Sequence, residues 1–209
     1  MRNTLIFICC YVLLVTSCNS SNKKTEDSKD STDTPTAVFP EDTQEISAVI
    51  TRFAAAYLLQ DQEKANALIH PDLGLYIIYR PGVADTYEKI DSLNFDRPTP
   101  EYFPYTTFEN DYTLTFEKLP AFDCGEEKWD KLGFFCDTTS QANQLTTIAA
   151  FDREFNGISD DALAKIKQLE KDTFRVILAK NEHLIFHVKK YDNKWYIFVL
   201  DRAYAGCDA

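Results

Sequence analysis

The chain has 209 residues and a formal net charge of −11, because 33 Asp and Glu outnumber 22 Lys and Arg. A surface that binds nucleic acid must be basic enough to displace counterions from phosphate, so this charge argues against nucleic acid as a partner. With 44% hydrophobic and 13% aromatic residues there is material for the core of one domain, and six Gly and eight Pro exclude a collagen-like chain.

The N-terminus has the pattern of an export signal. A short basic start, Met1 to Thr4, precedes an unbroken apolar run of 11 residues from Leu5 to Val15. That run is shorter than the ~20 residues that span a bilayer, but it has the length of the apolar part of a signal peptide. The next residues, Val15-Thr16-Ser17-Cys18, resemble the lipobox of bacterial lipoproteins.

This resemblance implies that residues 1–17 are removed and that Cys18 is lipidated. The protein would then be held at a membrane of the bacterial cell envelope, for which we expect the outer membrane, through the lipid anchor. Two or three acyl chains anchor a protein durably where a single chain does not. The alternative is an ordinary secretory signal peptide cleaved nearby, with Cys18 unmodified.

Residues 19–36 contain only Asn, Ser, Lys, Thr, Glu, Asp and Pro. Such a segment buries too little apolar surface to offset the entropy of ordering it. We therefore predict that residues 18–40 form the lipidated Cys and a disordered tether, and that residues 41–209 form one globular domain. The acidic and Ser-rich composition after Cys18 also resembles the surface-export signal of Bacteroidetes lipoproteins, with a plain periplasmic spacer as the alternative.

The first half of the domain has mixed patterns. Apolar residues at three- and four-residue spacing predict a helix from Thr43, as its cap, to Leu58. A second helix is predicted from a cap at Asp61 to Ile69, ended by the following proline. Leu73 to Arg80 has the pattern of a strand. Thr86 to Leu93 is predicted as a short helix, and Asp96 to Pro104, with three prolines, as an irregular loop.

The second half predicts two short strands, two helices and three long strands. Alternating apolar residues mark the strands Asp111 to Glu117 and Gly133 to Cys136, and helical patterns follow at Ser140 to Phe151 and Ser159 to Lys171. The clearest alternation marks three strands joined by tight links, so an antiparallel meander is expected. These strands are Thr173 to Ala179, His183 to Tyr191 and Lys194 to Asp201.

An opening helix with Phe53-Ala54-Ala55-Ala56-Tyr57 and closing strands with Leu184-Ile185-Phe186-His187-Val188 and Lys194-Trp195-Tyr196-Ile197-Phe198-Val199 resemble the NTF2-like (cystatin-like) family. The resemblance covers about residues 43–209. It implies an α+β cone with helices packed on a curved antiparallel sheet. Catalytic members of that family often use a carboxylate or His inside the cone. The residues here that would line such a mouth are His70, Asp72, Tyr76 and Tyr79.

The chain is also similar to uncharacterised Bacteroidetes lipoproteins through Phe122-Asp123-Cys124 and Gly206-Cys207-Asp208-Ala209. After loss of residues 1–17 and lipidation of Cys18, three thiols remain, which allow one disulfide and one free Cys. Because Cys136 lies in an apolar strand, a buried thiol is expected there. We favour a Cys124–Cys207 bridge, and Cys124–Cys136 is the alternative.

No metal and no cofactor is expected. His183 and His187 lie four residues apart on one predicted strand, ~13 Å at ~3.3 Å per residue, which is too far to share one ion. We interpret them as sheet-surface residues that share a face with Ile185. The acidic stretch from Asp123 to Asp130 lacks the twelve-residue calcium-loop pattern, so a solvated loop is preferred. The aromatic residues around Pro100 and Pro104 are expected to fold over the core rather than form an exposed rim; they are Tyr102, Phe103, Tyr105 and Phe108.

These observations favour a lipid-anchored envelope protein that binds a small ligand or another envelope protein, without catalysis. One alternative is an envelope enzyme of hydrolase or isomerase type that uses a carboxylate or His in the cone. Another is a structural or immunity-type lipoprotein that blocks a partner with its acidic surface.

Overall fold

The computed structural model describes residues 40–203. The chain divides into two units, residues 1–33 and 34–209, and every described residue belongs to the second. The predicted signal peptide, lipidated Cys18, most of the tether and Cys207 lie outside the described residues. Within them the elements are, in chain order, α1 Pro40–Leu58, α2 Gln62–Asn66, β1 Leu75–Tyr79, β2 Thr86–Ile90, β3 Leu114–Phe116, β4 Phe122–Asp123, β5 Lys128–Trp129, β6 Gly133–Cys136, α3 Gln144–Phe155, α4 Asp160–Leu169, β7 Thr173–Ala179, β8 His183–Tyr191 and β9 Lys194–Asp201.

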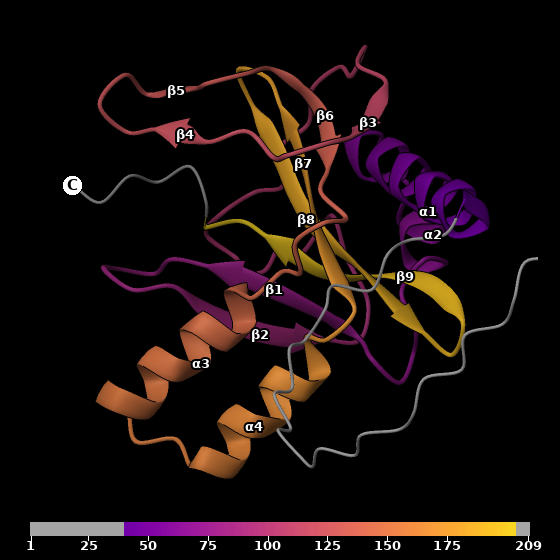
Figure 1. Ribbon diagram of the computed structural model, residues 1–209. Coiled ribbons are helices and arrows are strands. Elements are labelled where there is room, and N and C mark those ends of the chain that lie inside the picture. The colour runs from indigo at the N-terminus through magenta and orange to yellow at the C-terminus, as the bar shows by residue number, and fades with distance from the viewer. Residues whose placement is uncertain (1–39, 204–209) are drawn as a thin grey trace, which may run out of the picture. The chain divides into compact units, whose positions relative to one another are not determined.

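Seven strands form one curved sheet in the order β2-β1-β9-β8-β7-β6-β3 (Figure 1). Neighbouring strands are antiparallel except for two parallel pairs, β1 with β9 and β3 with β6. The two shortest strands, β4 and β5, pair separately as a hairpin. Helices and a mostly antiparallel sheet occur in separate stretches of the chain, so the fold class is α+β.

The predicted meander is confirmed, with the bounds of β7, β8 and β9 as expected. The side chains of these three strands are buried on both faces of the sheet, because different elements cover the two faces. The link between β8 and β9 is Asp192-Asn193, and both residues have positive φ, 48° and 60°. A two-residue turn of this kind matches the right-handed twist of a hairpin, which fixes the register of the two strands.

Helices α1 and α2 cover one face of the sheet. Helix α1 directs Ile46, Ile50, Phe53 and Tyr57 inward at helical spacing. They pack on the side chains that the strands direct to this face, among them Phe186, whose ring centroid lies 4.9 Å from that of Phe53. This first face holds the largest core cluster of the described residues.

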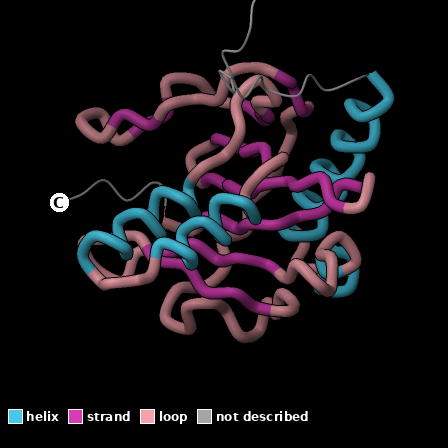
Figure 2. Tube along the Cα trace, turned by 60° about the horizontal axis from the view of Figure 1, so that its bottom comes forward, coloured by secondary structure: helices cyan, strands magenta, loops and turns pink. Residues whose placement is uncertain are grey.

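The second face is covered by two different elements. Helices α3 and α4 lie over β1 and β9, where Leu145 and Ile148 pack against Tyr76 and Phe198 (Figures 1 and 2). The β4–β5 hairpin lies over β7 and β8, where Trp129 packs in one cluster with aliphatic side chains of both strands. The sheet therefore lies between two layers.

Two predicted elements differ from the structure, and one observed element was not predicted. Residues Thr86–Leu93 were expected to be helical, but Thr86–Ile90 form the edge strand β2, paired antiparallel with β1. One side of β1 is paired with β9, and its other side is left with free backbone N–H and C=O groups. Residues Thr86–Ile90 pair with those groups, and this pairing makes them a strand. The second helix has the predicted cap, since the Asp61 carboxylate accepts from Lys64 N–H, but it ends at Asn66 rather than before Pro71. The β4–β5 hairpin was not predicted.

Candidate functional site

An open groove of about 880 Å³ lies between helix α1 and the extended segment of residues 107–114 that leads into β3. This volume is in the range of small-molecule sites. Apart from residues 107–114, the groove is lined by Thr51, Ala55 and Leu58 of α1, by Leu59 just after this helix, and by Phe134 of β6. It is on the same face of the sheet as α1, where the interior of a cone is expected.

Helix α1 forms one wall because it carries apolar residues outside the face that packs on the core. Phe53 and Tyr57 point into the core, whereas Ala55 and Leu59 are exposed on a neighbouring side of the helix. Leu59, just past the helix end, is 80% exposed. Its side chain therefore contributes to the groove wall rather than to the core.

Segment 107–114 forms the other wall and is held by Lys180. The Lys180 ammonium donates to the Glu109 carbonyl at 2.9 Å and to Asp111 Oδ1 at 2.7 Å, and it lies 5.8 Å from the centroid of the Tyr112 ring. The Asn110 side chain adds a local bond, since its Oδ1 accepts from Tyr112 N–H at 2.9 Å. These contacts give an extended segment without helix or strand a defined conformation.

The hydrogen bond between Lys180 and Asp111 changes both groups. It lowers the pKa of the Asp111 carboxyl and raises the pKa of the Lys180 ammonium, so both remain charged over a wide pH range. Both side chains are largely solvated, so the pair fixes geometry more than it adds stability.

The lining residues support binding better than catalysis. Apolar walls with a few polar groups are the usual composition of a ligand site. Among the described lining residues there is no His or Cys, and the carboxyl groups are those of Glu109 and Asp111. A nucleophile next to a base, which acyl or phosphoryl transfer requires, is not found among them.

Comparison with known proteins finds no relative of this chain. No family model, curated protein or solved structure matches this chain. The assignment of the site therefore depends on its own geometry and chemistry.

The four residues expected around a cone mouth are not brought together. His70 accepts a hydrogen bond on Nδ1 from Asp72 N–H at 3.1 Å, and its ring lies edge-on against Tyr191 and Tyr196 near the β8–β9 turn. On β1, Tyr76 belongs to the cluster under α3, whereas Tyr79 packs toward α1, so the two tyrosines lie on opposite faces. None of the four lines the groove.

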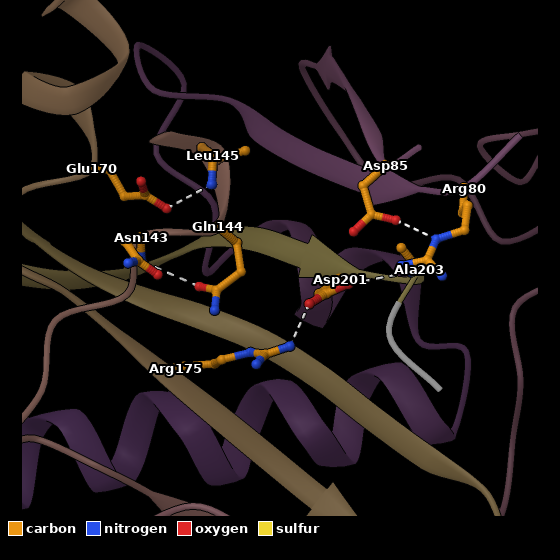
Figure 3. Close-up of polar contacts among 9 residues, drawn as sticks. All are labelled: Arg80, Asp85, Asn143, Gln144, Leu145, Glu170, Arg175, Asp201 and Ala203. Carbon is orange, nitrogen blue, oxygen red and sulfur yellow. Dashed lines mark hydrogen bonds and ion pairs between the residues drawn. The ribbon is translucent and has the colours of Figure 1, made fainter. Parts of the chain in front are cut away.

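The second face contains a buried polar cluster (Figure 3). Arg175 of β7 reaches across β8 to Asp201 of β9, and its Nη2 lies 2.6 Å from Asp201 Oδ2. Burial raises the pKa of the Asp201 carboxyl, against the opposing effect of the Arg175 guanidinium. Asp201 does not line the groove, so this buried carboxylate is separate from the candidate site.

His187 corrects the interpretation of the histidine pair. His183 and His187 share the face of Ile185 as predicted, but His187 is not at the surface: its exposed fraction is 0%. The layer over this face, which a strand pattern cannot reveal, covers it. Among residues 40–203 neither ring nitrogen of His187 finds a hydrogen-bond partner, and burial, with the neighbouring Arg175 charge, lowers the pKa of His187 well below 6.5.

The cysteines agree in part with expectation. Cys136 is a buried free thiol, as predicted, and burial raises its pKa. The alternative Cys124–Cys136 bridge is therefore not formed. Cys124 is disulfide-bonded, but Cys207 lies outside the described residues, so the Cys124–Cys207 pairing stays a prediction.

The acidic stretch and the aromatic loop agree in part with the non-binding roles that we expected for them. Asp123 Oδ1 accepts from the N–H groups of Gly125 and Glu126 and so shapes the β4–β5 turn. In residues 40–203 no three His, Cys, Asp or Glu side chains are arranged to hold a metal ion. Of the aromatic loop, Tyr105 is buried as expected, whereas Tyr102 is 69% exposed.

Sequence reasoning missed the groove. Its walls come from α1 and from residues 107–114, which are about 50 positions apart in the chain. The available signal was the apolar pair Leu58-Leu59 at the end of the predicted helix, together with Phe108 just before the predicted strand.

Proposed function

We propose that this protein is a lipid-anchored envelope protein whose domain binds an apolar small molecule in the groove between α1 and residues 107–114. The observation that carries the proposal is the groove itself, about 880 Å³ in volume and lined mainly by aliphatic and aromatic side chains. An open apolar hollow of this size is unfavourable to leave in water, and ligand binding is the usual reason for it.

We further propose that the domain is NTF2-like. In support, α1 packs along one face of a curved sheet, and the last three strands of the chain form a long antiparallel meander in the middle of that sheet. The groove also opens beside α1, on the face that a cone would enclose. The helical pair α3–α4 on the opposite face is an addition to the simplest form of that fold.

Anchoring is supported by the lipobox-like Val15-Thr16-Ser17-Cys18 and the polar stretch after it. None of the described helices is long and apolar enough to cross a bilayer. Labelling of producing cells with a radioactive fatty acid tests the anchor. The wild-type chain should incorporate label and the Cys18→Ala variant should not, while equal labelling of both would contradict the proposal.

Ligand binding is tested on the mature chain without its lipid, residues 19–209, which keeps every described residue and all three core clusters. N-phenyl-1-naphthylamine, a neutral apolar dye, should become fluorescent on entering the groove. Ala55→Trp, which fills the groove from α1, should weaken dye binding at least about tenfold, the effect of losing about 1.4 kcal/mol.

The matched control is Ala48→Trp. Ala48 is exposed on the same helix but does not line the groove, so the same change there should leave dye binding unaltered. Equal weakening by both variants, or no dye binding to the wild-type chain, would contradict a ligand site in the groove.

An enzyme remains the less supported reading. The residues expected to transfer protons in a cone lie away from the groove and on different faces of the sheet. Binding of an apolar ligand, by contrast, requires only the residues that line the groove.

A further inference from the structure

The charged groups of the groove are all negative. Glu109 and Asp111 are the charged residues among its lining, and no Lys, Arg or His is found among the described lining residues. The Asp111 charge is balanced by Lys180, which does not itself line the groove. The Lys180 ammonium also interacts electrostatically with Glu109, so two carboxylates face one ammonium group and the groove keeps a net negative charge.

The same segment already binds one ammonium group. Lys180 Nζ is held by a carboxylate, a backbone carbonyl and an aromatic ring, all supplied by residues 109–112. A carboxylate beside an aromatic face is the arrangement that recognises ammonium ions, through charge-assisted hydrogen bonds and cation–π attraction. Among the residues that line the groove, the same segment contributes one further carboxylate, that of Glu109, and the aromatic residues Phe108 and Tyr112.

We infer that the ligand of the groove is a cationic amphiphile: an apolar chain or ring that carries an ammonium group. The apolar part lies against Leu58, Leu59 and Phe134, and the ammonium group lies at Glu109. This inference rests on the proposed binding function and names its ligand class. An anionic amphiphile such as a fatty acid is disfavoured, because its carboxylate would meet two carboxylates that share one ammonium group, in a chain of net charge −11.

The test compares three ligands that are built on a chain of twelve carbons and carry a positive, a neutral and a negative head group. Dodecyltrimethylammonium, dodecanol and dodecanoate, each below its micelle concentration, compete with N-phenyl-1-naphthylamine for the chain of residues 19–209. The cation should displace the dye at the lowest concentration. We expect a gap of about fivefold or more between cation and anion, the size of one solvated charge pair.

Two variants separate a specific contact from general attraction to an acidic protein. Glu109→Gln should weaken binding of the cation by about threefold to fivefold and leave binding of dodecanol unchanged. Glu45→Gln removes the same charge from an exposed position of α1 outside the groove and should change neither. Raised salt should reduce the preference for the cation.

The outcomes distinguish the two proposals. If none of the three ligands displaces the dye, or the dye does not bind, the proposed binding function is wrong. If the dye and dodecanol bind but dodecanoate binds as tightly as the cation, the groove remains a ligand site and the cationic class is wrong. Equal effects of Glu109→Gln and Glu45→Gln would likewise overturn the role of Glu109.

Discussion

Glu170, at the end of α4, caps α3 through the backbone N–H of Leu145, which donates to Glu170 Oε1 at 2.9 Å (Figure 3). The other carboxylate oxygen accepts from Thr146 N–H at 2.8 Å. The residue in the N-cap position, Asn143, makes no side-chain capping bond. One helix of the α3–α4 pair thus satisfies the free N–H groups of the other.

We therefore expect Glu170→Ala to destabilise the domain by about 1–3 kcal/mol, because two N–H groups lose their buried acceptor. Urea unfolding of residues 19–209 gives the free energy. Ser159→Ala is the matched control: Ser159 caps α4 through a single bond, to Ala162 N–H at an exposed site, and should cost about 1 kcal/mol or less. A smaller loss for Glu170→Ala than for Ser159→Ala would contradict this capping role.

The buried imidazole of His187 should make stability depend on pH. Its pKa in the folded protein lies well below 6.5, while the unfolded chain titrates near ~6.5. Between these values the unfolded state binds the proton and the folded state does not, so stability falls as pH is lowered through that window. The loss approaches about 1.4 kcal/mol per pH unit.

His187→Leu should remove this part of the slope between pH 7 and pH 5. At pH 7 the variant should be at least as stable as wild type, because two buried nitrogens without partners disappear. Chemical denaturation at several pH values measures both effects. An unchanged slope in the variant would show that His187 is not the titrating group.

Arg175 and Asp201 should behave as a coupled pair. Arg175→Met leaves the buried Asp201 carboxylate without its guanidinium, which costs about 3–5 kcal/mol. Asp201→Asn leaves the guanidinium and should also destabilise. The double variant should be less destabilised than the sum of the two, and the difference measures their coupling. Strict additivity in the double-mutant cycle would contradict the contact.

The predicted Cys124–Cys207 bridge has a simple test. On the chain-entropy model, closing that loop contributes about 4–5 kcal/mol, so Cys124→Ala and Cys207→Ala should each lower the melting temperature by a similar amount, and the double variant little further. Cys136→Ala should cause only a small loss, independent of reductant, since Cys136 is free and buried. Peptide mapping of the unreduced chain identifies the bonded pair, and a melting temperature insensitive to reductant would contradict the bridge.

The sequence predicts the meander well because each of β7, β8 and β9 carries its own alternation and turn residues. It does not predict β2, because Thr86–Ile90 have no clear apolar face and become a strand only by pairing with β1. The β4–β5 hairpin has two residues per strand, too few for any period to be visible.

The candidate site is less predictable because it also depends on contacts between segments that are far apart in the chain. The groove requires that α1 and residues 107–114 lie side by side, a long-range relation that no local pattern contains. The burial of His187 depends on what covers the second face. In both cases the chemistry of each residue is visible in the sequence, but its environment is decided by tertiary packing.

The parallel pairing of β9 with β1 has a consequence for how the chain acquires its structure. β9 comes last among the strands in chain order, yet it lies between β1 and β8 near the middle of the sheet. The β1–β2 hairpin therefore has no link to the rest of the sheet until Lys194–Asp201 are in place. Closing so long a loop is entropically costly and slows folding. If the chain crosses a membrane with its N-terminus first, as the proposed export signal implies, the complete sheet can form only after β9 has emerged.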